Sequence, residues 1–296
     1  MNDIVPFLSK RIASRLDRTR VDIQDSFLMT PKDFSWKVRW RMKYDRNPLF
    51  VVLQDKYSVK EYARERGVKT ADIYYVTDQP ETIPFDSLPE KYFIKANHGC
   101  GWNILYENGK FYNWISGEAL INRDLSKSVV TKEKCISLCK SWLGFTYAKR
   151  QWAYQDIRPL IVVEEKLEPH DGVALIDYRC FVFDGVVKVI NQDSPMYDMK
   201  TNLFVDASWQ PFDLPQHYEK LPDPLPEKPQ NLCEIVKTAE RLGKGLDFVR
   251  VDLFNTTKGI VLGEMTIYPE GGEINTPTAD PDFNRWLGDQ WILPKL

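Results

Sequence analysis

The sequence predicts an α+β protein, because helix-like and strand-like segments are interspersed along the chain without regular alternation. Apolar residues recur with helical spacing in residues 54–67, 131–147 and 231–243. Short β-type runs separated by Asn-Gly and Asp-Gly turns occupy much of the remaining chain. We therefore expect a helical N-terminal region followed by β-hairpins with helices between them.

The composition is that of a globular protein without a transmembrane or secretory segment. The 296 residues are 43% hydrophobic and 13% aromatic, enough for a sizeable core. No run approaches the roughly 20 apolar residues needed to span a bilayer, so we expect a cytoplasmic protein. Five cysteines form no CxxC pair and are interpreted as core thiols. A net charge of -2 argues against nucleic acid as a partner.

The N-terminal segment is basic, unlike the rest of the chain. The first fifty residues carry eleven basic and six acidic side chains. The apolar residues Phe7, Leu8, Ile12 and Leu16 recur near helical spacing beside arginines. Such an amphipathic helix is suited to peripheral contact with the inner face of a membrane or with a phosphorylated lipid carrier. The alternative is a solvated helix packed on the body of the protein.

The first elements follow from local residue patterns. Residues 54–67 predict one amphipathic helix, and Gly67 stands where glycine commonly caps a helix C-terminus. The inward positions of this helix are Val59, Tyr62 and Ala63. Residues 91–114 then change to β-type runs, with Asn108-Gly109 as a hairpin turn. The sequence therefore places Lys95 at the end of a strand and a glycine loop after it.

The later elements are predicted in the same way. They are a helix at 131–147, an apolar strand at 160–167, a hairpin at 177–193, a proline-rich connector at 221–229, a helix at 231–243 and two strands at 247–254 and 260–267. Apolar side chains of the 231–243 helix should face the core at Leu232, Ile235, Val236, Ala239 and Leu242. The last two strands are joined by NTTKG, which we expect to close a hairpin.

A glycine loop follows Lys95 in the motif FIKANHGCGWN. Gly99 and Gly101 allow the backbone to approach a polyphosphate, so that its N–H groups point at the oxygens. The alternative is a tight structural loop with Lys95 in water. The chain contains neither GxxxxGK[ST] nor GxGxxG, which disfavours two common nucleotide-binding folds.

Two carboxylates are expected on one face of the last hairpin. Side chains alternate along a strand, so Arg250, Asp252 and Phe254 share a side. A regular hairpin places Leu262, Glu264 and Thr266 on that same side. Carboxylates held this close repel each other unless a cation lies between them, which predicts a magnesium site. The alternative is an ion pair of Arg250 with Glu264 on a wet face.

A third candidate group is Arg179 in the apolar strand DYRCFVF. It shares a strand face with Asp177, Phe181 and Phe183. An arginine among aromatic side chains usually has an anionic partner. That partner is either a phosphate group of a substrate or Asp177.

These motifs together resemble the ATP-grasp superfamily, specifically its teichuronopeptide-biosynthesis (TupA-like) branch. The resemblance runs from about Trp36 to the C-terminus. It rests on the order of QDKYSVKEYARERGV, LPEKYFIKANHGCGWN, VVEEKL, DYRCFVFDG, FVRVDLF and LGEMTIYPEGGE. It implies a helical N-terminal region at 1–70 and two α+β subdomains, 71–160 and 161–296, with ATP sandwiched between them.

The resemblance also implies roles for individual residues. The nucleotide contacts would be Lys95, Asn97, His98, Gly99, Gly101, Glu164, Glu165, Lys166, Leu167 and Glu168. The residues facing the reacting phosphate would be Arg179 and Arg250, with Lys95. The Mg²⁺ ligands would be Asp252, Glu264 and Thr266. Many members of the superfamily have asparagine where this chain has Thr266, and a hydroxyl is a weaker magnesium ligand than an amide oxygen.

The implied activity is ATP-dependent carboxylate–amine ligation through an acyl phosphate. Its partners would be a small-molecule or saccharide carboxylate and an amine, in the modification of a bacterial surface polysaccharide. The rival function is a glycosyltransferase, whose Asp-x-Asp signature is matched only by Asp280-Pro281-Asp282. A carbohydrate-binding protein and a kinase that stops at a phosphorylated product are further alternatives. Among the histidines, only His98 lies in a candidate site, and His170 and His217 are interpreted as structural.

Overall fold

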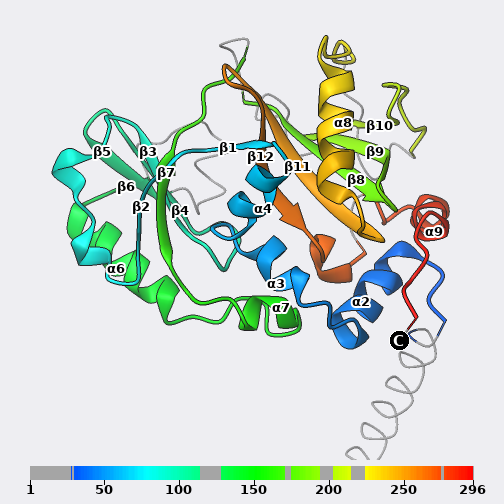
Figure 1. Cartoon of the computed structure of the whole chain (residues 1–296), viewed down its shortest axis with the longest axis horizontal. Helices are drawn as coiled ribbons and strands as arrows, with labels where there is room; N and C mark the ends of the chain where they lie inside the picture. The colour runs from blue at the N-terminus through cyan, green and yellow to red at the C-terminus, as the bar shows by residue number, and fades with distance from the viewer. Residues whose placement is uncertain are drawn as a thin grey trace, which may run out of the picture.

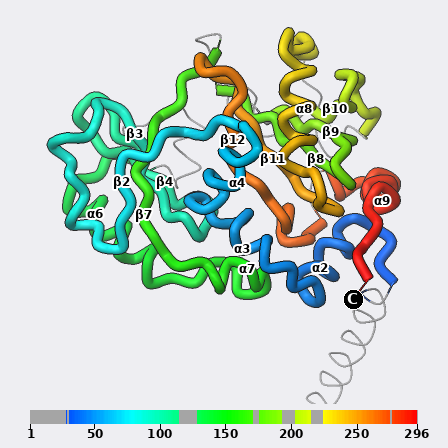
Figure 2. Tube along the Cα trace, in the orientation of Figure 1, coloured from blue at the N-terminus to red at the C-terminus, as the bar shows by residue number. Residues whose placement is uncertain are grey.

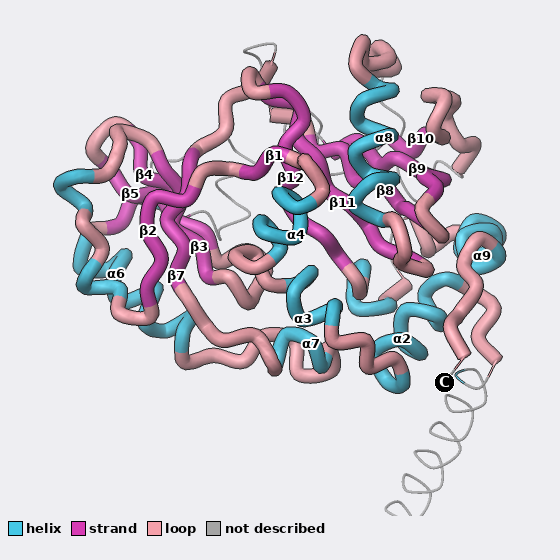
Figure 3. Tube along the Cα trace, viewed as in Figure 1, coloured by secondary structure: helices cyan, strands magenta, loops and turns pink. Residues whose placement is uncertain are grey.

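The computed structural model describes residue 28 and residues 30–113, 128–170, 175–193, 203–214, 224–274 and 277–295. Two six-stranded sheets lie next to each other along the long axis of the molecule (Figure 1). Helices α3 (Leu49–Gln54) and α4 (Val59–Glu65) pack on the second sheet. The strands of the two sheets form separate groups in Figure 3. The predicted α+β class is confirmed. The predicted N-terminal amphipathic helix lies outside the described residues.

The first sheet has the strand order β2-β7-β3-β4-β5-β6 and is antiparallel throughout. Its strands are β2 (Ile73–Thr77), β3 (Tyr92–Ala96), β4 (Asn103–Glu107), β5 (Lys110–Asn113), β6 (Val129–Val130) and β7 (Ile161–Glu165). Helix α6 (Lys132–Leu143) packs on it through Cys135, Cys139 and Trp142, as its apolar spacing predicts. Helical turns η1 (Pro80–Thr82) and η2 (Phe85–Ser87) join β2 to β3.

The second sheet has the strand order β1-β12-β11-β8-β9-β10 and contains the larger core. Its strands are β1 (Lys69–Thr70), β8 (Asp177–Phe183), β9 (Val186–Asp193), β10 (Leu203–Val205), β11 (Phe248–Thr256) and β12 (Gly259–Thr266). Helix α8 (Leu232–Gly243) covers one face of this sheet with the predicted inward residues (Figure 1). Strand β7, which begins at residue 161, pairs within the first sheet, and β1, which ends at residue 70, pairs within the second.

The remaining helices connect and cover the sheets. They are α2 (Phe34–Tyr44), α3 (Leu49–Gln54), α4 (Val59–Glu65), α7 (Trp152–Gln155), η4 (Pro269–Gly272) and α9 (Pro281–Asp289). Helices α2 and α9, blue and red in Figure 2, come from opposite ends of the chain and pack side by side. Buried Arg41 anchors α2, because its guanidinium donates to Phe248 O and Asp247 and stacks on Trp291.

The prediction of a single helix at 54–67 is wrong at its N-terminal end. Helix α3 ends at Gln54 and α4 begins at Val59, with a turn between them. The Asp55 carboxylate accepts hydrogen bonds from Tyr57 N at 2.9 Å and from Ser58 Oγ at 2.6 Å. Such local bonds compete with helical backbone bonds, which explains the break. Gly67 has the left-handed φ of +66° expected of a helix-terminating glycine.

The predicted turns at Asn108-Gly109 and Asp184-Gly185 are confirmed, since both residues of each pair have positive φ. The β11–β12 hairpin differs from the prediction. Its strands extend into NTTKG, and a β-bulge interrupts the pairing at Gly263. Leu262 therefore pairs with Leu253 in the core instead of sharing the face of Asp252.

Two further observations complete the fold. Cys135, Cys139 and Cys180 are buried as predicted, whereas Cys100 and Cys233 are exposed, so the expectation of core thiols is wrong for these two. Across the part of the chain that the structure describes, no helix combines the length and the apolar character needed to cross a bilayer.

Candidate active site

A cleft of about 1180 Å³ opens on the face of β11 and β12 that carries the predicted metal residues. Helix α2 and residues 147–154 form its other walls. Five of the residues singled out in the sequence line it: Arg179, Arg250, Asp252, Glu264 and Thr266. The described residues lining the cleft include Cys100 from the glycine loop but neither Lys95 nor the hinge residues. The structure therefore brings the strand residues together in one concave site.

Asp252 and Glu264 are directly opposite each other on β11 and β12, and Arg250 is opposite Thr266. Because the bulge at Gly263 lies between these pairs and the tip of the hairpin, all four side chains face the cleft. Arg250 donates to both Asp252 oxygens, at 2.8 and 2.7 Å, and to Thr266 Oγ1 at 3.1 Å. Burial opposes the charge of Arg250, but Asp252 outweighs it and raises the pKa of the guanidinium.

Glu264 is paired with Lys56, a residue that the sequence did not single out. The two side chains approach to 2.9 Å, and Lys56 N also donates to Asn97 O at 3.0 Å. Burial alone would raise the pKa of Glu264, but the Lys56 ammonium and then Arg250 lower it overall. The ion pair suggested as an alternative, Arg250 with Glu264, is replaced by the pairs Arg250–Asp252 and Lys56–Glu264.

Lys95 forms an ion pair with Glu164 at 2.5 Å, between adjacent strands of the first sheet. Lys60 of α4 approaches the other Glu164 oxygen at 2.8 Å. Burial would raise the pKa of Glu164, but Lys95 and Lys60 lower it to about 2. Lys95 also contributes to the lowered pKa of Glu264, so the two ion-pair groups interact electrostatically across the sheets.

The glycine loop after Lys95 is held by its own polar side chains. Asn97 donates to Asp55 Oδ1 at 2.8 Å and accepts from Leu160 N at 2.7 Å. The buried His98 ring lies within hydrogen-bond distance of Asn97 Oδ1 and Trp142 O, and burial lowers its pKa. These contacts commit both side chains to the framework of the loop and leave its backbone as the candidate phosphate-binding surface.

The two glycines of the loop serve different purposes. A Cβ on Gly99 would lie 2.5 Å from the Trp102 ring, so this position requires close packing. Gly101 has a φ of +74°, and a Cβ added there would meet no other atom within 4 Å, so its requirement is conformational.

The predicted hinge, residues 164–168, makes ion pairs with residues of both sheets. Glu165 pairs with Lys258 at the tip of the β11–β12 hairpin, at 2.7 Å. Lys166 pairs with Glu107 at 3.1 Å, and the exposed Glu168 lies 3.7 Å from Lys166. Leu167 is half-buried. The segment is thus an ordered connection at the junction of the sheets.

Arg179 pairs with Asp177 at 2.9 Å, the protein partner considered in the sequence. Both residues line the cleft, so the arginine remains beside the Arg250–Asp252 pair. Burial and then the Asp252 charge raise the pKa of Asp177. Although Arg179 is paired with Asp177, its guanidinium therefore still lies in the candidate site.

The Asp280-Pro281-Asp282 match to a glycosyltransferase signature begins helix α9. Asp280 is the N-cap and accepts from Phe283 N at 2.7 Å. Neither aspartate lines the cleft. No cluster of three or more His, Cys, Asp or Glu residues suited to a metal occurs within the described ranges. His217 lies outside those ranges, and His170 lies in the connection before β8.

Several solved structures of ligases resemble the chain at low sequence identity. D-alanine–D-alanine ligase from Bacillus anthracis, complexed with ATP, is 16% identical over 81% of this chain and 63% of its own, with a TM-score of 0.45. The ATP-grasp ligase PsnB, complexed with a precursor variant, Mg and ADP, is 14% identical over 95% and 73%, with a TM-score of 0.43. VanG D-Ala:D-Ser ligase from Enterococcus faecalis is 15% identical over 81% and 60%, with a TM-score of 0.42.

The chain spans less than two thirds of the length of the first of these ligases. No curated protein sequence gives a significant match. The family described as TupA-like ATP-grasp matches residues 36–292, nearly the whole chain. The chain therefore belongs to the TupA-like ATP-grasp family.

Proposed function

We propose that this protein is an ATP-dependent carboxylate–amine ligase that forms an amide bond through an acyl phosphate. One observation carries the proposal: Asp252, Glu264, Arg250 and Thr266 face one large cleft, where anionic and cationic groups lie within hydrogen-bond distance. A site of this kind handles phosphoryl groups by positioning and charge neutralisation, without a protein nucleophile. Membership of an ATP-grasp family supports the same interpretation.

The nucleotide would bind at the junction of the sheets. We assign Lys95 to its phosphates and the backbone of residues 97–101 to a flap over them. The backbone of residues 164–168 would contact adenine, with Glu168 beside the ribose. In this assignment Lys95 exchanges part of its contact with Glu164 for phosphate, while Lys60 keeps that carboxylate paired. We retain 71–160 and 161–296 as the two subdomains, with β7 as the strand that joins them.

The donor atoms at Asp252 and Glu264 fit a magnesium ion. Mg²⁺ prefers hard oxygen ligands, and these two carboxylates are neighbours on one face of a hairpin that borders the cleft. Bound there, with Thr266 nearby, the ion would neutralise phosphate charge during transfer. Arg250 and Lys56 already pair with the same two carboxylates. They would therefore have to share these oxygens with the metal.

The reaction would begin with transfer of the γ-phosphoryl group to the substrate carboxylate. Arg250 and Arg179 face the cleft and would stabilise the negative charge that develops on the transferred group. The amine then attacks the acyl carbon, and phosphate leaves. The strand-borne arginines are held by Asp252 and Asp177, which keeps them oriented before the substrate arrives.

The substrate class is the finer part of the proposal. The family resemblance favours a uronic acid or another saccharide carboxylate of a bacterial surface polysaccharide, joined to an amine or amino acid. Action in the cytoplasm, with contact between the basic N-terminus and a membrane or lipid carrier, belongs to the same proposal and rests on the sequence alone. A cleft of about 1180 Å³ is large enough for a sugar acid.

The deciding experiment combines binding with turnover. Mg-ATP at 100 times its dissociation constant should stabilise the folded chain by about 2.7 kcal/mol, and EDTA should remove most of that effect. Screening uronic acids with amines and amino acids should then identify a pair that releases ADP. Sugar transfer from a nucleotide sugar without ATP consumption would instead support a glycosyltransferase and contradict the ligase.

A further inference from the structure

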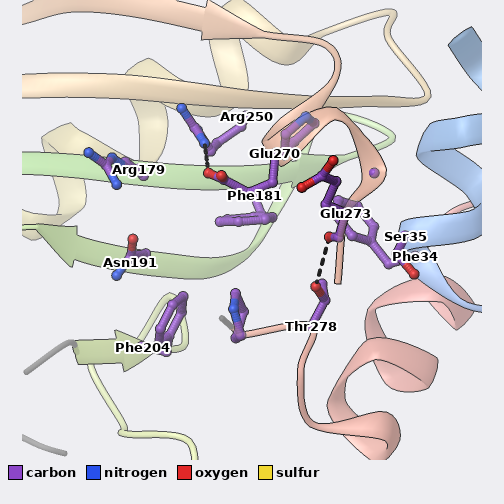
Figure 4. Close-up of a pocket in the computed structure, with 13 residues that line it drawn as sticks. Phe34, Ser35, Arg179, Phe181, Asn191, Phe204, Arg250, Glu270, Glu273 and Thr278 are labelled. Carbon is purple, nitrogen blue, oxygen red and sulfur yellow. Dashed lines mark hydrogen bonds and ion pairs between the residues drawn. The ribbon is translucent and has the colours of Figure 1, made fainter. Parts of the chain in front are cut away.

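A smaller side cavity of about 180 Å³ adjoins the cleft (Figure 4). Arg179, Arg250, Glu270 and Glu273 line both spaces. The cavity extends from them between strands β8 to β10 and the chain that follows β12. A ligand in the side cavity would therefore reach the reacting groups of the cleft.

The volume of the side cavity limits what it holds. An engineered protein cavity of about 150 Å³ accommodates benzene, which has six non-hydrogen atoms. A space of about 180 Å³ thus suits a molecule of similar or slightly larger size. A sugar acid would need the larger cleft. The two spaces therefore have the relative sizes expected for a small amine substrate and a larger carboxylate substrate.

Charges of opposite sign lie on different sides of the side cavity. Figure 4 shows Arg179 and Asn191 on one side and Glu273 on the other. Glu270 extends toward Arg250, at 4.0 Å, between these two sides. None of the ion pairs formed among the described residues uses Glu273. The apolar walls, Phe181 and Phe204, are almost fully buried, whereas Glu270 and Glu273 are exposed to solvent.

The acidic side of the cavity is fixed by its backbone. Glu270 has a φ of +50°, unusual for a residue other than glycine, and Gly271 and Gly272 are also left-handed. A Cβ on Gly272 would lie 2.8 Å from Ser35 O of α2, so this turn is tightly packed against the helix. The strained turn places Glu270 and Glu273 at the junction of cavity and cleft. A ligand that binds these side chains therefore does not have to order the backbone of the turn.

We propose that the side cavity binds a small zwitterionic α-amino acid. Its carboxylate would face Arg179 and Asn191, and its ammonium would face Glu270 and Glu273. That this amino acid supplies the amine for ligation rests on the proposed function, whereas its binding does not. In the ligation the C–N bond forms as the C–O bond to phosphate breaks. Of the three ammonium protons, one stays on the amide, one leaves with phosphate and one passes to solvent.

The test is calorimetric titration of the full chain with a panel of L- and D-amino acids, with and without Mg²⁺ and AMP-PNP. The best ligand is then compared with its N-acetyl and its amide derivatives, each of which removes one charge. We expect either derivative to bind at least about tenfold more weakly. Glu273→Gln should weaken amino-acid binding about as much, whereas Glu234→Gln on the exposed side of α8 should leave it unchanged.

Two results would overturn the amino-acid site: binding of both singly charged derivatives as tight as that of the parent amino acid, or no binding of any amino acid in either condition. The nucleotide titration of each sample reports whether a variant is folded. Failure of AMP-PNP to bind the unsubstituted protein would instead contradict the proposed ligase. Amino-acid binding without any amino-acid-dependent ADP release, across the uronic acids tested, would support the site and contradict its role in ligation.

Discussion

The Lys56 ammonium lies 2.9 Å from a carboxylate oxygen of Glu264 and joins the turn between α3 and α4 to strand β12. The turn is itself held by Asp55, which accepts from Asn97 Nδ2 at 2.8 Å. The glycine loop, the inter-helix turn and the candidate metal site are therefore one connected polar network. The negative charges of a nucleotide bound at the loop would therefore act electrostatically on Glu264 through Lys56.

Replacing Lys56 should change the pH dependence of turnover. Lys56 lowers the pKa of Glu264, so Lys56→Met should raise that pKa toward or above its usual value. A protonated Glu264 is a poor metal ligand, and we expect the variant to lose activity between pH 7.5 and pH 5 more steeply than the parent. ADP release measured across this range, with Lys91→Met as the control, checks the prediction. Parallel profiles would argue against it.

Lys95→Ala should weaken Mg-ATP binding by about tenfold or more, because a charge-assisted contact to phosphate is lost. The fold should persist, since Lys60 remains paired with Glu164. Equilibrium titration with AMP-PNP measures the affinity, and Lys134→Ala at an exposed position of α6 provides the comparison. Unchanged affinity in Lys95→Ala would remove this residue from the nucleotide site.

Glu264→Ala should abolish ADP release while the protein remains folded. The side chain faces the cleft and belongs to neither core cluster, so its removal leaves the hydrophobic packing intact. Loss of one carboxylate should also weaken Mg²⁺ affinity, which a metal titration in the presence of AMP-PNP reports. Full turnover by the variant would show that Glu264 is not a metal ligand.

Glu164→Gln should reduce stability in a pH-dependent manner. The folded pKa of about 2 lies below the usual value of 4.5, so the ionised carboxylate stabilises the fold above pH 4.5, and that contribution is lost as the pH falls toward 2. We expect a loss on the order of 3 kcal/mol at pH 7 that shrinks at pH 3. Urea unfolding at both pH values measures it, and Glu234→Gln is the control. A loss of equal size at both pH values would contradict the assignment.

Gly288→Ala should destabilise the protein, although glycine is usually unfavourable inside a helix. A Cβ at this position of α9 would lie 2.0 Å from Lys32 O, in the segment that precedes α2. We expect a loss of about 3 kcal/mol or more in urea unfolding. Gly144→Ala, where the nearest atom lies 3.8 Å away, should change stability by less than about 0.5 kcal/mol. If both variants are equally stable, α9 can move away from the segment that precedes α2 without cost, and the prediction is wrong.

The amino-acid sequence by itself determined the features that depend on neighbouring residues. The inward face of α8, the Asn108-Gly109 and Asp184-Gly185 turns and the alternation that puts Arg250 beside Asp252 all follow from spacing of a few residues. The order of the motifs also indicated the family, whose model matches residues 36–292. These inferences needed no knowledge of which segments meet in space.

The tertiary structure alone decided which charges from distant segments meet. Lys56 and Glu264 are 208 positions apart, so no local pattern connects them, and the same holds for Lys60 with Glu164. The bulge at Gly263 shifts the pairing by one residue, so that Leu262 faces the core. A Cβ on Gly263 would lie 2.5 Å from the Phe254 ring, which explains why this position is glycine. Pairing of this kind depends on how the two sheets and the helices beside them pack together, which is a property of the whole fold.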